Sequence, residues 1–277
     1  MHNSKFPLSE EEINADLARI LSSLSNMKDD KLKLKTIFSC IDNTTLEGSD
    51  NENKIKDFCS TSVAYIHGNT SLASLCVYPI FVGLVKDCLQ GTGIKTASVA
   101  GGFPSAQMPF DLRMKEIEYS VKQGADEIDA VISRGLLLAR DYDRVYKELL
   151  AIRDICKDVK LKVILETGEL QTIDNIYIAS NIAIESGADF IKTSTGKISV
   201  GATEQAAYVM LTSIIEHFKS TGKLVGFKAS GGISSVEQAI KYLMIAENFY
   251  GSNNVDNKCF RIGASRLTKL VHEQMIG

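Results

Sequence analysis

The fold is decided by residues 161–194, LKVILETGELQTIDNIYIASNIAIESGADFIKTS. A short apolar run, LKVILE (161–166), precedes a helical pattern over 172–187, and a second short run, FIKTS (190–194), follows it. Two such runs separated by a helical segment are typical of a parallel βαβ unit. This stretch therefore predicts two neighbouring parallel strands joined by a helix.

The same alternation extends in both directions along the chain. Strands are expected at 36–42, 73–78, 95–100, 127–133, 161–166, 190–194, 224–230 and 259–263. Eight βα units in 277 residues favour an α/β fold of the (β/α)8 TIM barrel type, for which about 250 residues is typical. A doubly wound open sheet is the main alternative. The first βα turn lacks G-x-G-x-x-G, but this absence excludes only the dinucleotide-binding version of that fold.

An additional helix is expected at the N-terminus. Ser9 and Glu12 have the spacing of a capping box, and apolar residues recur every three to four positions from Ile13 to Leu24. We therefore expect a single barrel domain over 1–277, with 1–34 as an N-terminal helical extension that caps the floor of the barrel.

Composition limits the classes of function. The chain is 44% hydrophobic and 23% charged with a formal net charge of -3, which argues against nucleic-acid and membrane-surface partners. Neither a span of about 20 apolar residues nor a secretory apolar region is found, so a cytoplasmic location is expected. The six cysteines and four histidines lack the spacing of metal ligands, so we expect no metal site and six reduced thiols. Cys76 is the one thiol for which reactivity is the alternative to packing.

Three ionisable residues are expected to meet inside the barrel. Strand side chains alternate between the interior and the helix layer, which turns Lys192, Lys228 and Asp129 inward near the carboxyl ends of their strands. Adjacent strands lie about 4.8 Å apart, so the two ammonium groups can approach closely. A lone lysine near a strand end is more often a solvated rim residue, but two inward lysines beside an inward aspartate favour catalysis.

This group of side chains suits amine catalysis. A lysine with an ordinary pKa is only about one part in a thousand neutral at pH 7.4, and only the neutral amine attacks a carbonyl. A second cation and burial lower that pKa. Geometry alone does not decide which of the two lysines is the nucleophile. Asp129 is expected to act as general acid and base through a water.

Glycine-rich loops follow the last three strands: STGK (194–197), SGG (230–232) and GAS (263–265). In barrels, the loops after strands seven and eight together with a helix N-terminus commonly bind phosphate, because backbone N–H groups and the helix dipole favour an anion. These loops predict a phosphorylated substrate, although any single glycine is equally consistent with a tight turn.

The motifs ADFIKTSTGK, VGFKASGGI, GADEIDAVI, LCVYP, VILETGEL and RIGAS together resemble the deoxyribose-phosphate aldolase family of class I aldolases over about 36–268. The resemblance implies a (β/α)8 barrel that reversibly cleaves 2-deoxy-D-ribose 5-phosphate into acetaldehyde and D-glyceraldehyde 3-phosphate without a cofactor. It implies a Schiff base on Lys192, with Lys228 lowering its pKa and Asp129 moving protons. Partners would be phosphorylated sugars and aldehydes and, as in many members, a second copy of the chain.

The resemblance also implies the binding residues. Phosphate contacts fall on Gly196, Lys197, Gly231, Gly232, Gly263 and Ser265. Asp42 matches a position near the sugar hydroxyls, and its structural alternative is an Asx turn that closes the first strand.

The chain departs from the family pattern at three places. Ile233 and Ser234 stand where many members have Val-Arg, and Arg266 stands where a serine is common. The sequence ends HEQMIG without the C-terminal tyrosine of some members. Two other hypotheses stay open at this point: another lysine-dependent aldolase for a phosphorylated sugar or keto acid, and a non-catalytic phosphosugar-binding barrel, which the intact lysine pair disfavours.

Overall fold

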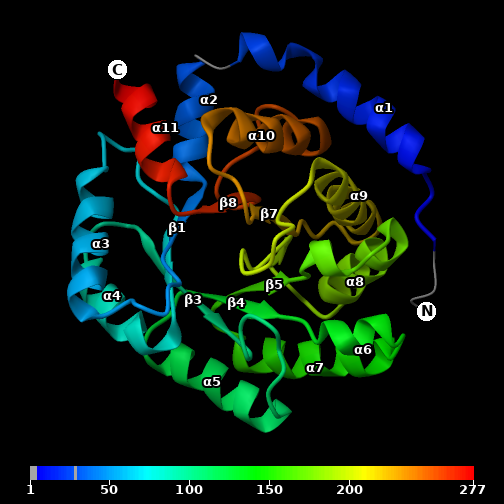
Figure 1. Cartoon of the computed structure of the whole chain (residues 1–277), viewed down its shortest axis with the longest axis horizontal. Coiled ribbons are helices and arrows are strands. Elements are labelled where there is room, and N and C mark those ends of the chain that lie inside the picture. The colour runs from blue at the N-terminus through cyan, green and yellow to red at the C-terminus, as the bar shows by residue number, and fades with distance from the viewer. Residues whose placement is uncertain (1–4, 28–29) are drawn as a thin grey trace.

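Eight parallel strands close into a barrel in the computed structural model, which describes residues 5–27 and 30–277 (Figure 1). Each strand pairs with the next one in the sequence, and the eighth pairs with the first. The strands are β1 (Ile41–Thr44), β2 (Ser74–Val77), β3 (Lys95–Ala100), β4 (Glu127–Val131), β5 (Lys160–Ile164), β6 (Phe190–Lys192), β7 (Gly226–Ser230) and β8 (Phe260–Ala264). The (β/α)8 barrel is confirmed, and the open sheet is excluded.

Helices surround the barrel (Figure 1). The α-helices are α1 (Glu10–Ile20), α2 (Lys31–Ser39), α3 (Glu52–Ala64), α4 (Val82–Cys88), α5 (Phe110–Lys122), α6 (Arg134–Leu138), α7 (Tyr142–Ile155), α8 (Ile173–Glu185), α9 (Glu204–Thr221), α10 (Val236–Tyr250) and α11 (Leu267–Ile276). Short 3-10 helices are η1 (Leu21–Asn26), η2 (Pro79–Phe81) and η3 (Thr167–Glu169).

The first strand begins later than the sequence indicated. Residues 36–39, expected in a strand over 36–42, form the last turn of α2. Asp30 caps this helix by accepting hydrogen bonds from two backbone amides, and Leu34, Ile37 and Phe38 are buried on one helical face. Apolar residues continue from Ile37 and Phe38 in α2 through Cys40 to Ile41 at the start of β1, with one polar residue, Ser39, between them, so the pattern alone could not separate the two elements.

The N-terminal helix α1 begins at the predicted capping box of Ser9 and Glu12. The prediction that it caps the barrel floor is wrong: α1 lies across the outside of α9 and α10 in the helical ring (Figure 1). Ile13 and Leu17 are buried in this contact, and the Tyr208 hydroxyl on α9 donates a 2.6 Å hydrogen bond to Asp16. The added helix thus covers the apolar outer faces of two ring helices.

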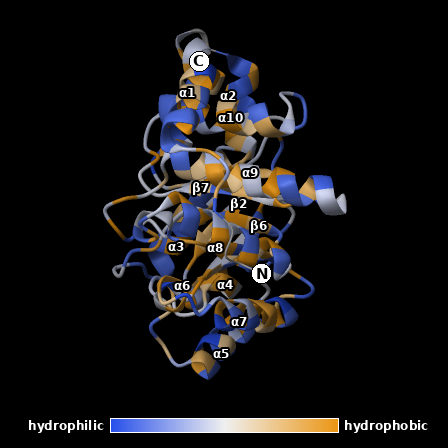
Figure 2. Ribbon diagram, turned by 90° about the vertical axis from the view of Figure 1, so that its right-hand side faces the viewer, coloured by the Kyte–Doolittle hydropathy of each residue, from blue (hydrophilic) through white to orange (hydrophobic). Residues whose placement is uncertain are grey.

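Hydrophobic residues concentrate in the strands, whereas the ring helices alternate between hydrophobic and hydrophilic residues (Figure 2). This is the pattern of helices that pack one face on a barrel. Inside the barrel, the Phe190 ring fills the space beside Gly226, where a Cβ atom would lie 2.2 Å from the ring. Above this aromatic plug, the interior becomes polar.

Candidate active site

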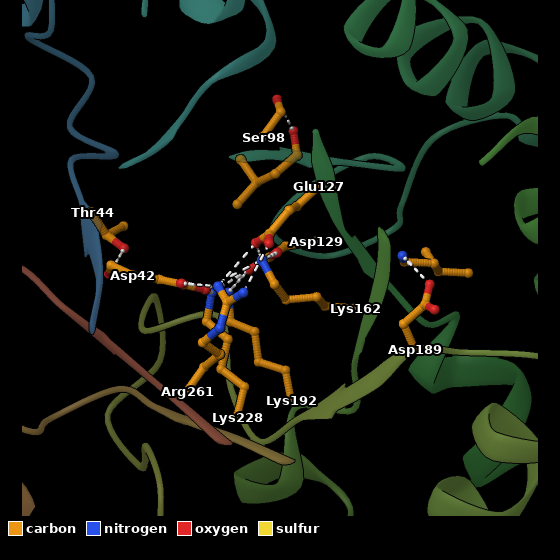
Figure 3. A network of polar contacts seen from close by, with 12 residues as sticks. Asp42, Thr44, Ser98, Glu127, Asp129, Lys162, Asp189, Lys192, Lys228 and Arg261 are labelled. Atoms are coloured by element: carbon orange, nitrogen blue, oxygen red, sulfur yellow. Dashed lines mark hydrogen bonds and ion pairs between the residues drawn. The ribbon is translucent and has the colours of Figure 1, made fainter. Parts of the chain in front are cut away.

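Strand register brings the predicted lysines together. Lys192 on β6 lies directly opposite Lys228 on β7, and Asp129 on β4 lies opposite Lys162 on β5. All four side chains point into the barrel, as the alternation along each strand requires (Figure 3). The predicted convergence of Lys192, Lys228 and Asp129 is therefore present, with a third lysine that was not predicted.

Seven charged side chains form one network inside the barrel, which we call the ion layer (Figure 3). Its members are Asp42, Glu127, Asp129, Lys162, Lys192, Lys228 and Arg261. They come from β1, β4, β5, β6, β7 and β8, and each is at most 3% exposed. Burial of so many charges is tolerated only where each is paired.

Asp129 binds all three lysines of the ion layer. Its Oδ2 atom accepts hydrogen bonds from Lys192 Nζ and Lys228 Nζ, both at 2.7 Å, and its Oδ1 atom accepts one from Lys162 Nζ at 2.9 Å. Burial opposes ionisation of this carboxyl, but the lysines, led by Lys162, hold its pKa below the ordinary value. Asp129 is therefore a carboxylate at neutral pH that contacts the Lys192 amine directly, and its action as general acid and base through a water stays a prediction.

The three lysines differ in their ionisation. Burial lowers the pKa of Lys192, Asp129 opposes this shift and the charge of Lys228 adds to it, leaving the pKa below the ordinary lysine value. Burial also acts on Lys228, but Asp129 and Asp42 outweigh it and raise its pKa. Lys162 responds in the same way and more strongly, because Asp129, Asp42 and Glu127 all face it. Only Lys192 is shifted toward the neutral amine.

Access from the pocket also distinguishes Lys192 from the other two lysines. A pocket of about 280 Å³ opens at the carboxyl ends of the strands, and Lys192 is the ion-layer member that lines it. Lys192 is 3% exposed, whereas Lys162 and Lys228 are fully buried. A molecule in the pocket can therefore reach Lys192 Nζ, while Lys162 and Lys228 lie beneath the pocket and influence Lys192 through their charge.

The predicted phosphate residues surround this pocket. Gly196, Lys197, Gly231, Gly232, Gly263 and Ser265 all line it. They lie in three segments that we call the mouth loops: 195–197, 230–234 and 263–266. Gly231 adopts φ +87°, and a Cβ atom on the adjoining Gly201 would lie 2.2 Å from the Gly231 carbonyl oxygen. Glycine is thus required where these loops pack against each other.

Two helices begin at the mouth loops. The N-terminus of α10 is closed by its own capping box, Ser235 with Gln238. In the part of the chain that the structure describes, no side chain caps α11, which follows Ser265 and Arg266. Its first amides are therefore not engaged by a capping side chain and can receive an anion.

The family departures fall on the same pocket. Ile233, Ser234 and Arg266 line it. Where many family members carry an arginine at the position of Ser234, this chain instead presents a guanidinium at position 266, on the neighbouring loop. The lining cations are thus Lys192, Lys197 and Arg266. Lys197 Nζ also donates a hydrogen bond to the Leu46 carbonyl oxygen, across the mouth from its own loop.

Glu166 holds the first mouth loop from below. This fully buried residue adopts φ +56°, a strained conformation for a side chain with a Cβ atom. Its Oε1 atom accepts a hydrogen bond from the Thr195 amide, its Oε2 atom accepts one from the Thr195 hydroxyl, and Arg134 binds the same oxygen at 3.2 Å. The Thr195 hydroxyl accepts a hydrogen bond from the Lys197 amide in turn.

Asp42 lies in the ion layer and does not line the pocket. One oxygen accepts a 2.5 Å hydrogen bond from Lys228 Nζ, and the other accepts a 2.6 Å hydrogen bond from Arg261. The Asx-turn alternative is not seen either, because these side chains engage the carboxylate. A direct contact of Asp42 with the sugar hydroxyls stays a prediction.

Sequence reasoning missed Lys162, Glu127, Arg261 and Glu166. A signal was present for two of them: Lys162 shares the inward parity of Ile164, and Glu127 precedes the inward Asp129 by two residues. Arg261 pairs with Lys228 in register, which the sequence of β8 alone does not reveal.

The thiols take no part in this network. All six cysteines are free, and burial raises the pKa of Cys76 to about 11, which favours packing over reactivity. Within residues 5–27 and 30–277, no group of three His, Cys, Asp or Glu side chains could hold a metal ion. His2 lies outside the described residues. In the same part of the chain, no helix is long and apolar enough to cross a bilayer.

Comparison with known proteins identifies aldolases as the relatives of this chain. Residues 36–251 match the family model described as DeoC/LacD family aldolase. The chain is 40% identical over 248 residues to the deoxyribose-phosphate aldolase of Homo sapiens, covering 85% of this chain and 78% of that protein.

Solved structures resemble the chain over most of its length. A structure described as QR15, an aldolase, matches with a TM-score of 0.71 and 29% identity, covering 87% of this chain and 96% of that one. The tetrameric deoxyribose phosphate aldolase of Aeropyrum pernix has a TM-score of 0.72 at 24% identity, covering 98% and 99% of the two chains. At that identity, the second likeness bears on the fold alone.

Proposed function

Since this chain belongs to the DeoC/LacD family of aldolases, we propose that Lys192 forms the Schiff base of its reaction, with Lys228 and Asp129 as its partners. The chain is a lyase that cleaves 2-deoxy-D-ribose 5-phosphate reversibly to acetaldehyde and D-glyceraldehyde 3-phosphate. The observation that carries the assignment is that Lys192 lines the pocket and has a lowered pKa, whereas Lys162 and Lys228 are enclosed and have raised pKa values.

The first half of the reaction forms the imine. Neutral Lys192 Nζ attacks the aldehyde carbon of the open-chain sugar, and the carbinolamine loses water to give a protonated imine. Asp129, in contact with Nζ at 2.7 Å, accepts the proton that the amine sheds and passes it to the former carbonyl oxygen, and one further proton from solvent allows this oxygen to leave as water. The charge of the iminium then lies next to the carboxylate that faced the ammonium.

The second half breaks the carbon–carbon bond. The C3 hydroxyl loses its proton, the C2–C3 bond electrons flow into the iminium, and glyceraldehyde 3-phosphate leaves while an enamine remains. A proton added at C2 and hydrolysis of the new imine release acetaldehyde and restore the amine. Asp129 is the carboxylate placed to move these protons, directly or through a water.

The phosphate of the substrate is bound by the mouth loops. Support comes from Gly196, Gly231, Gly232, Gly263 and Ser265, which line one pocket with the uncapped N-terminus of α11 beside them. Lys197 and Arg266 supply the positive charge. Arg266 thereby takes a place that the family resemblance gave to a serine.

A homodimer and a cytoplasmic location stay predictions from the family resemblance and from composition.

Trapping tests the assignment. Incubation with acetaldehyde followed by borohydride should leave a stable adduct on the peptide that contains Lys192, located by mass spectrometry. Lys192→Ala should lose the adduct and reduce kcat for cleavage on the order of 10⁴-fold or more. An adduct on Lys228 or Lys162 in the wild-type protein would overturn the proposal.

A further inference from the structure

Lys162 is a buried lysine for which the proposed reaction has no direct use. Its Nζ atom lies 2.5 Å from Glu127, 2.9 Å from Asp129 and 3.2 Å from Asp42, and it is fully enclosed. It does not line the pocket, so it meets no substrate. Burying an ion in this way costs several kcal/mol before pairing, so its presence calls for a physical reason.

The charges of the ion layer do not balance. Four cations, Lys162, Lys192, Lys228 and Arg261, face three carboxylates, Asp42, Glu127 and Asp129. With every group ionised, one positive charge is left in excess inside a barrel that excludes water. The remaining titratable neighbour, Cys76 on β2, stays a neutral thiol because burial raises its pKa to about 11, and the one titratable residue of β3, Lys95, is exposed.

Contacts decide which cation gives up its proton. Among the described residues, Lys162 touches three carboxylates and Lys228 touches two, whereas Lys192 touches one, that of Asp129. Arg261 does not deprotonate in proteins. Loss of the Lys192 proton therefore makes the layer neutral at the smallest loss of pairing.

We propose that the net charge of the ion layer, and not the neighbouring ammonium alone, keeps Lys192 available as a neutral amine, with Lys162 and Glu127 as positioning residues that act on it without touching it. The inference rests on the proposed role of Lys192 as the Schiff-base lysine. It extends the control of Lys192 from Lys228, its partner in register, to residues on β4 and β5 that the substrate does not reach.

The proposal predicts opposite shifts from two substitutions. Glu127→Gln raises the excess charge by one, so the acid limb of the kcat/KM profile should move to lower pH. Lys162→Met removes the excess, so the limb should move to higher pH. A buried charge within about 10 Å changes a pKa by on the order of one unit at an effective dielectric constant of about 20, which sets the size of each shift.

The double variant Glu127→Gln/Lys162→Met restores the excess of one positive charge. Its acid limb should return to within about 0.3 pH unit of the wild-type position, a tolerance well below the shift of about one unit expected from a single charge. Lys160→Met is the matched control, because it removes an exposed lysine from the same strand two residues earlier. Its profile should be unchanged.

The experiment measures the pH profile of cleavage and, in parallel, the pH dependence of acetaldehyde trapping by borohydride, with circular dichroism to verify folding. The proposal is supported if the acid limb lies at the lowest pH in Glu127→Gln, at an intermediate pH in the wild type and the double variant, and at the highest pH in Lys162→Met. Should Lys162→Met fail to fold, Glu127→Gln and the double variant decide the question. Acid limbs that do not shift, or that shift in the same direction in both single variants, overturn the charge proposal, while trapping on Lys192 still supports the proposed function. Trapping on another lysine overturns the proposed function itself.

Discussion

The ion layer and the mouth loops hold charge in different ways. In the ion layer, side chains on rigid strands pair with each other at 2.5–3.2 Å and exclude solvent. At the mouth, the groups proposed to bind the anion are glycine backbone and the side chains of Lys197 and Arg266, which line the pocket. We therefore propose that the protonation of the Lys192 amine is set by residues below the pocket, and that the phosphate is recognised by residues that line it.

The largest effect is expected in the ion layer. Lys228→Leu removes the cation opposite Lys192, so the Lys192 pKa should rise and the acid limb of kcat/KM should move up by about one to two pH units. Because the amine must be neutral to react, activity at pH 7 should fall about 10- to 100-fold and partly recover at higher pH.

The KM for phosphorylated substrate, extrapolated to the new optimum, should change little for this variant. A lowered rate with an unaltered pH profile would show that Lys228 does not tune the ionisation of Lys192.

A smaller and different effect is expected at the mouth. Glu166→Gln weakens the hydrogen bonds that hold Thr195 and removes one of the two carboxylates that pair with Arg134, so KM for deoxyribose 5-phosphate should rise about tenfold, equivalent to about 1.4 kcal/mol. The acid limb should stay in place, and KM for 2-deoxyribose without phosphate should change less.

Glu169→Gln is the matched control, because Glu169 also binds Arg134, at 2.7 Å, but is exposed and lacks a described bond to Thr195. It should leave both KM values near wild type. If Glu166→Gln shifted the pH profile rather than KM, the division between ion layer and mouth would not hold.

The smallest effect on catalysis is expected outside the ring. Ile13→Ala removes a fully buried side chain from α1 where it packs on α9 and α10, and should lower the free energy of unfolding by about 2–4 kcal/mol. kcat and KM should be unchanged below the melting temperature, as measured by thermal unfolding and steady-state kinetics. A changed pH profile would connect this helix to the ion layer.

Much of this arrangement could be predicted from the sequence because barrel strands alternate with a period of two. That period placed Lys192, Lys228 and Asp129 inward and at one level, and the glycine loops at one mouth. It did not distinguish the two lysines, since both lie at the same depth. The distinction depends on how many carboxylates each ammonium meets and on which one the pocket reaches, and both are three-dimensional facts.

Lys162 was missed for a related reason. In LKVILE, one lysine among apolar residues is typical of a strand with a solvated end, and nothing local shows that carboxylates from β1 and β4 surround it. The error at the first strand had a local cause, because the apolar residues at the end of α2 are separated from Cys40 and Ile41, at the start of β1, by Ser39 alone. The docking of α1 on the ring could not be predicted, because the apolar face of a helix can be recognised in the sequence but the surface that packs against it cannot.

The ion layer also fills the barrel between the mouth and a charged hollow at the opposite end, which Glu127, Lys95 and Lys160 help to line. Lys192 is therefore approached from the mouth, the side of the proposed phosphate site. We expect product release to be ordered as a result: the three-carbon phosphate must vacate the entrance before water can enter to hydrolyse the two-carbon imine. In the synthetic direction, glyceraldehyde 3-phosphate should then bind after acetaldehyde.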